Sequence, residues 1–167
     1  MVSGLTTRLS LGRWRVTHMG YYLQAIIGKQ RTLAHHASEF QHARIVLLAQ
    51  GIAIIPMTDD LYDEIAEGGE VDGFYKLSQS IEEWAQRIST VAPVAYIEAE
   101  FFGGTGGQSA VAWSQGSRVL GPIHVQHAIN EALRFFGVRV DGAHDEFDAV
   151  GLGRHRETAD WIAEATP

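Results

Sequence analysis

The segment from residue 94 to residue 113 constrains the fold most strongly, because it has the pattern of two strands joined by a short glycine-rich loop. Val94–Phe102 (VAYIEAEFF) is rich in aromatic and β-branched residues, Gly103-Gly104-Thr105-Gly106-Gly107 follows, and residues 109–113 (SAVAW) resume the strand pattern. Two such strands around a glycine-rich loop predict a β-hairpin. At least part of the sheet is therefore expected to be antiparallel.

Weaker patterns on either side predict the remaining elements. We expect strands at residues 20–27, 52–55 and 117–120, a strand or helix end at 45–48, and helices at 29–42, 59–67, 81–88, 121–136 and 157–165. Thr58 and Ser80 are the expected N-caps of the second and third helices, and Gly121-Pro122 is the expected start of the fourth. This order predicts an α+β fold with a mixed, largely antiparallel sheet of about four or five strands and helices packed mainly on one face.

The length and composition fit one domain. The chain has 167 residues, of which 46% are hydrophobic, and no Cys, so disulfides and thiolate chemistry are excluded. We expect a single domain at residues 19–167, preceded by an extension at residues 1–18 that holds three Arg and no acid. We favour Met19 as the true start; a disordered basic arm and a transit peptide are the alternatives for the extension.

The charge balance limits the classes of partner. The formal net charge is −7 and the chain has only two Lys, Lys29 and Lys76. Binding to nucleic acid needs clustered Lys and Arg, so we expect no nucleic-acid partner. No apolar run approaches the ~18 residues of a membrane span. We expect a cytoplasmic protein whose acidic surface suits a basic protein partner or a cation; the sequence leaves the oligomeric state open.

The glycine-rich loop and the strand before it carry the first candidate site residues. A phosphate-binding loop needs a helix and a Lys after its glycines, whereas here a second strand follows, so we interpret the loop mainly as a mobile turn. Gly104, Thr105 and Gln108 are retained as candidate ligand contacts. Glu98 and Glu100 project from one face of their strand, where they would act as acid and base or bind a cation. A solvated outer face of a sheet has the same pattern.

Two further groups of polar residues are candidates for a site. His124, His127 and Glu131 have helical spacing that a zinc site would use, but the pattern is also that of an exposed helix face, so we predict no metal and no cofactor. Residues 145–156 combine acids, glycines and a basic triplet. Asp145, Asp148, Arg154 and Arg156 are candidate ligand contacts if this segment folds over the glycine loop, with His155 as a candidate acid or base. The structural alternative is a capped linker with ion pairs between its acids and its arginines.

Five segments together resemble a group of small bacterial hypothetical proteins. They are MGYYLQAIIGK from Met19, QGIAIIPMTDDL from Gln50, PVAYIEAEFFGGTGGQSAVAW from Pro93, AINEALRFFGV from Ala128 and DEFDAVGLGRHRETADW from Asp145. The resemblance covers residues 19–161. It implies a bacterial source, but it implies no activity and supplies no site residues.

Three functions remain open from the sequence. The first is a non-catalytic interaction protein, for example a toxin-neutralising immunity-type protein whose acidic surface masks a basic enzyme. The second is a small hydrolase or phosphate-ester enzyme that uses the glycine loop and the Arg154–Arg156 stretch, with His155 or Glu98 moving protons. The third is a cation-binding protein built on Glu98, Glu100 and the acids near Asp145. We favour the first.

Overall fold

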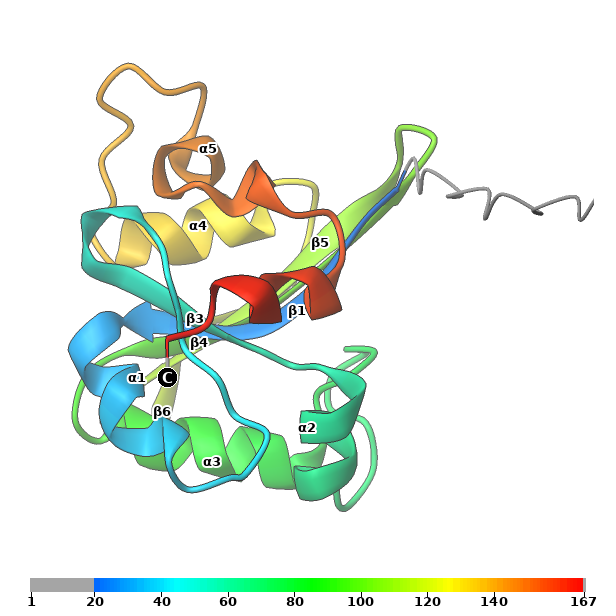
Figure 1. Ribbon diagram of the computed structural model, residues 1–167, viewed down its shortest axis with the longest axis vertical. Helices are drawn as coiled ribbons and strands as arrows, with labels where there is room; N and C mark the ends of the chain where they lie inside the picture. The colour runs from blue at the N-terminus through cyan, green and yellow to red at the C-terminus, as the bar shows by residue number, and fades with distance from the viewer. Residues whose placement is uncertain (1–19, 167) are drawn as a thin grey trace, which may run out of the picture.

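The computed structural model describes residues 20–166, and its sheet runs through the middle of the molecule (Figure 1). The expectations for residues 1–18 and for a start at Met19 lie outside the described residues. The strands are β1 (Gly20–Lys29), β2 (Val46–Leu47), β3 (Ile52–Pro56), β4 (Val94–Phe102), β5 (Thr105–Ser114) and β6 (Ser117–His124). The helices are α1 (Gln30–Ala37), α2 (Asp59–Ile65), α3 (Gln79–Ser89), α4 (Ala128–Phe135) and α5 (Glu146–Val150), with 3-10 turns η1 (Ala49–Gly51), η2 (Leu152–Arg154) and η3 (Thr158–Glu164).

The six strands form one sheet in the order β2-β3-β1-β4-β5-β6. Every pair of neighbouring strands in this sheet is antiparallel. The predicted α+β class is confirmed, and the sheet has six strands where about four or five were expected. Among the described residues, no helix is long and apolar enough to cross a bilayer.

Helices cover both faces of the sheet, so the expectation of helices packed mainly on one face is corrected (Figure 1). One core contains Leu33 of α1, Leu61 of α2 and Trp84 of α3; the other contains Leu133 of α4 and Trp161 of η3. The reason lies in the strands: successive residues of β4 from Val94 to Ala99 are all buried, and neighbours in a strand point to opposite faces. A strand that is buried on both faces needs a layer of helices on each side.

The chain from Gly121 to Val125 departs from the prediction, because β6 continues through Gly121-Pro122 where a helix start was expected. Gly121 has φ 73°, and a Cβ there would lie 2.6 Å from the carbonyl oxygen of Ala110, so this turn of the strand needs glycine. Pro122 has no N–H to donate, and it fits here because β6 is an edge strand with no outer neighbour to accept one. Helix α4 begins only at Ala128, where the Gln108 side chain accepts the Ile129 N–H at 3.0 Å.

The N-cap of α2 is the predicted residue, whereas the N-cap of α3 is not. Thr58 caps α2 as predicted, by accepting the Leu61 N–H at 3.3 Å. The cap of α3 is Ser78 and not Ser80, because the helix begins two residues earlier than expected. Ser80 instead donates to the Ile65 carbonyl oxygen at 2.7 Å and accepts the Glu67 N–H at 2.7 Å, so it ties the end of α2 to the start of α3.

Candidate functional site

Four polar side chains form a row across the sheet. In the strand register Gln24 of β1 lies opposite Glu98 of β4, Glu98 opposite Ser109 of β5, and Ser109 opposite His124 of β6. Residues that are direct neighbours across strands point to the same face. The row is therefore continuous, on the same face as Tyr96, which packs in the core under α1 and α3.

The loop between α2 and α3 covers this row and is tied to it by Glu98. The carboxylate of Glu98 accepts the Tyr75 N–H at 2.8 Å and the Lys76 N–H at 2.7 Å. The hydroxyl of Tyr96, two residues before Glu98 in β4, donates to the Lys76 carbonyl oxygen at 2.6 Å. Glu98 is thus an anchor for the loop as well as a charged group beneath it.

The environment of Glu98 makes its charge costly. Its side chain is only 9% exposed, and this burial raises its pKa above the usual value of a glutamate. The N–H groups of Lys76 and Tyr75 and the nearby His124 oppose that rise, without cancelling it. Glu98 is therefore a carboxyl group whose charge is sensitive to what binds beside it.

Ser109 and His124 form a hydrogen-bonded pair. The Ser109 Oγ lies 2.7 Å from His124 Nδ1, and His124 Nε2 lies 2.9 Å from the carbonyl oxygen of Asp72. The Phe74 ring, with its centroid 5.2 Å from that of His124, packs against the imidazole. The ring is held from two sides by hydrogen bonds and from a third by an aromatic side chain.

A cavity of about 670 Å³ opens over the row. Three carboxylate side chains line it, from Glu70, Glu98 and Glu100, and no Lys or Arg is among the described residues that line it. Its rim carries exposed apolar side chains: Phe102 is 76% exposed, Tyr75 61% and Val125 54%. We call this space the acidic cavity; Glu98 is buried at its floor, whereas Glu70 and Glu100 are exposed beside the apolar side chains at its mouth.

Glycines of β5 form one wall of the acidic cavity. Gly106 packs so closely on β4 that a Cβ there would lie 1.9 Å from the Glu100 carbonyl oxygen, whereas a Cβ on Gly107 would meet nothing within 4 Å. The tight turn of the hairpin is only Gly103-Gly104, since Thr105 already pairs with Phe102. The hairpin and the start of β1 project beyond the helices (Figure 1).

The structure brings together part of the predicted site. Glu98, Glu100, Thr105 and Gln108 all line the acidic cavity, while Gly104 is at the hairpin turn outside its lining. Gln108 lines it with the side-chain oxygen engaged by the Ile129 N–H of α4.

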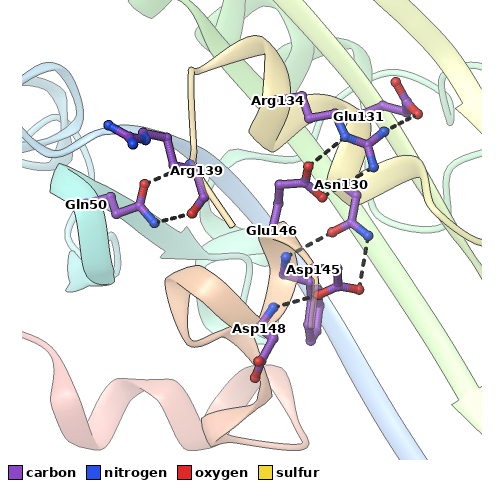
Figure 2. Close-up of polar contacts among 9 residues, drawn as sticks. Gln50, Asn130, Glu131, Arg134, Arg139, Asp145, Glu146 and Asp148 are labelled. Carbon is purple, nitrogen blue, oxygen red and sulfur yellow. Dashed lines mark hydrogen bonds and ion pairs between the residues drawn. The ribbon is translucent and has the colours of Figure 1, made fainter. Parts of the chain in front are cut away.

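The acids near residue 145 are not at the cavity. Figure 2 shows that Asp145 accepts from Asn130 and from the Asp148 N–H, and that Arg134 pairs with Glu146 beside them. Asp145 is the N-cap of α5, and Asp148 accepts the His144 N–H at 3.1 Å. The contacts with Asn130 and Arg134 join α5 to α4, and the other two lie at the start of α5, so all of them are structural.

The basic triplet is divided between two places. Arg154 and His155 both bind Glu164, at 2.7 Å and 2.5 Å. Arg156 lines a separate groove of about 320 Å³ beside Tyr22 and Phe102. Of the five candidates in the 145–156 segment, only Arg156 approaches the hairpin; its groove shares Glu100 and Phe102 with the acidic cavity, which Arg156 itself does not line.

The three residues considered for zinc do not share a helix. His124 ends β6, His127 is the N-cap of α4 and Glu131 pairs with Arg134. Within residues 20–166 no group of three His, Cys, Asp or Glu side chains is arranged to hold a metal ion.

Sequence reasoning missed Gln24, Glu70 and the Ser109–His124 pair. The signal for Ser109 was the alternation of side chains along a strand, which places it on the same face of β5 as Val111 and Trp113. Its partners were hidden because the hairpin turn was expected to span five residues and the chain at His124 was expected to be helical.

Comparisons with protein-family models, with curated proteins and with solved structures found no match to this chain. The resemblance to a bacterial group stays a prediction, and the function has to be argued from the site itself.

Proposed function

We propose that this chain is an interaction domain that captures a positively charged side chain of a partner protein in the acidic cavity. The observation that carries the proposal is the lining: Glu70, Glu98 and Glu100 face a space of about 670 Å³ that no Lys or Arg in the described part of the chain lines. A guanidinium or ammonium group entering this space gains charge-assisted hydrogen bonds to the carboxylates.

The rim favours a protein partner over a small free cation. Phe102, Tyr75 and Val125 expose apolar surface around the mouth of the cavity. Aromatic side chains around a pocket that takes one charged anchor are a common arrangement at protein interfaces. An arginine suits this geometry better than a lysine, because its planar head stacks on aromatic rings while it binds carboxylates.

The overall charge supports the same function. With a net charge of −7, the chain attracts a basic protein from a distance, which speeds association. A protein that neutralises a basic toxin is one concrete form of this function. The phosphate-ester alternative has less support, because an acidic lining repels phosphate and Arg154 binds Glu164 outside the cavity.

The proposal is tested by calorimetric titration with N-acetyl-arginine amide and with the tripeptide Gly-Arg-Gly with both termini blocked. We expect Glu100→Gln to weaken binding about fivefold, a loss of about 1 kcal/mol for one partly solvated charge contact. Glu83→Gln is the matched control, because it removes the same charge from an exposed position of α3 outside the cavity. Equal affinities for the wild type and both variants, or stronger binding of acetate than of arginine amide, would contradict the proposal.

The affinity for arginine amide is expected to depend on pH through Glu98. Burial raises the pKa of Glu98 in the free protein, and a bound cation stabilises the carboxylate and lowers that pKa. Binding is therefore full at a pH above the raised pKa and weakens as the pH falls through it, with proton release on binding in that range. Calorimetry in two buffers of different ionisation enthalpy measures the released protons. No proton release at any pH between 4 and 7 would show that Glu98 does not contact the bound cation.

A further inference from the structure

We propose that Ser109 is a nucleophile activated by His124, and that it attacks an ester or similar acyl carbonyl brought into the acidic cavity. This activity goes beyond capture of a charged group. It follows from a different observation, the Ser109–His124 pair, and does not require any particular partner.

The fold places the two side chains together by strand register alone. Ser109 and His124 are direct neighbours on β5 and β6, and the distance from Ser109 Oγ to His124 Nδ1 is 2.7 Å. Both residues line the cavity, and Ser109 is half-buried. A substrate in the cavity therefore meets the hydroxyl and its base from the same side.

The hydrogen bonds of the imidazole determine its tautomer. A carbonyl oxygen only accepts, so the contact of 2.9 Å to the Asp72 carbonyl oxygen requires a proton on His124 Nε2. In the neutral ring Nδ1 is then unprotonated, and the Ser109 hydroxyl donates to it. This is the arrangement in which histidine acts as a general base toward serine, with a backbone carbonyl in the orienting position that a carboxylate has in other such sites.

The surroundings stabilise the charge that the reaction creates. When His124 accepts the serine proton it becomes an imidazolium, with the Asp72 carbonyl at one nitrogen and the Glu98 carboxylate nearby. The Glu98 carboxylate belongs to the same row across β4, β5 and β6, so it attracts the positive charge that forms on the ring. The Phe74 ring restricts rotation of the imidazole.

The reaction balances with water as the only co-reactant. Ser109 Oγ attacks the carbonyl carbon while its proton moves to His124 Nδ1. The bond between that carbon and the alcohol oxygen breaks, and the alcohol leaves with the proton from Nδ1, which gives an acyl-serine. Water, deprotonated by the same nitrogen, then attacks the acyl carbon; the bond to Ser109 Oγ breaks, Oγ takes the proton back from Nδ1, and the acid leaves.

The first test uses a neutral fluorophosphonate probe and peptide mapping of the labelled full-length chain. We expect labelling at Ser109 that is lost in Ser109→Ala, falls at least tenfold in His124→Gln, and is unchanged in Ser114→Ala. Ser114 is the matched control, because it is a half-buried serine on the same strand that lies opposite Ser117. Labelling at another residue, or undiminished labelling in a folded His124→Gln variant, would overturn the proposal.

A second test does not depend on how well His124→Gln folds. The chain has no cysteine, so Ser109→Cys and Ser114→Cys each introduce a single thiol. We expect iodoacetamide to alkylate the first about tenfold faster, because His124 favours the thiolate. Equal rates would overturn the proposal. Excess N-acetyl-arginine amide should slow alkylation of Ser109→Cys. If alkylation of Ser109→Cys is fast and arginine amide does not slow it, the result supports the activated serine and contradicts only the proposed cation site.

Discussion

Replacing Gly106 by Ala is expected to destabilise the protein by about 3 kcal/mol, while the same change at Gly107 leaves its stability nearly unaltered. At Gly106 the new Cβ would lie 1.9 Å from the Glu100 carbonyl oxygen and 2.7 Å from the Phe101 Cα, both backbone atoms that cannot move without separating β4 from β5. At Gly107 it would meet nothing within 4 Å. Urea unfolding of the two variants measures the difference.

This comparison also tests the register on which the site depends. The same pairing that brings Gly106 against β4 places Glu98 opposite Ser109. A shift by one residue would turn each side chain of β5 to the other face. Equal stability of the Gly106→Ala and Gly107→Ala variants would contradict this register and the polar row built on it.

Replacing Glu98 by Ala is expected to release the loop between α2 and α3 and to lower the free energy of unfolding by about 2 kcal/mol. The carboxylate is the acceptor for the Tyr75 and Lys76 N–H groups, and the partial burial of these groups makes an unpaired state costly. The loss is smaller than two charged hydrogen bonds would suggest, because the variant no longer buries a carboxylate whose pKa is raised by that burial.

Hydrogen exchange gives the residue-level form of this prediction. The amides of Tyr75 and Lys76 should lose protection in Glu98→Ala by more than the amides of α3 do. Glu100→Ala is the control, since Glu100 is exposed on the same face of the same strand. Unchanged protection of the two loop amides would show that Glu98 does not hold the loop over the cavity.

Local signals in the sequence were sufficient for several elements. The bounds of β4 agree with the prediction at Val94–Phe102, and Thr58 caps α2 as expected. Both rest on contacts within a few residues: the strand on its unbroken β-forming residues, the cap on one hydroxyl and the N–H three positions later. The sequence of β4 also indicated helices on both faces of the sheet, because both alternating sets of its residues are largely apolar. The prediction of helices mainly on one face followed from the fold class and not from this pattern.

Features that depend on distant contacts could not be predicted in the same way. Gly121-Pro122 has a local preference for a helix start, and pairing with β5 overrides it. The candidate site shows the same division: Glu98 and Glu100 were found from alternation within one strand, whereas Ser109 and His124 meet only through the register of β5 and β6. The sequence left open whether the acids near residue 145 fold over the hairpin or lie in a capped linker, and contacts with Asn130 and Arg134 hold α5 against α4 (Figure 2).

Binding of a positively charged side chain in the acidic cavity is tested most directly by a titration of the isotope-labelled protein with N-acetyl-arginine amide, followed by amide chemical shifts. We predict saturable shifts concentrated at Gly107, Ser109, Tyr75 and Lys76, much reduced in Glu100→Gln and kept in Glu83→Gln. Shifts that are scattered over the acidic surface, or that centre on the groove beside Arg156, would contradict binding in the acidic cavity.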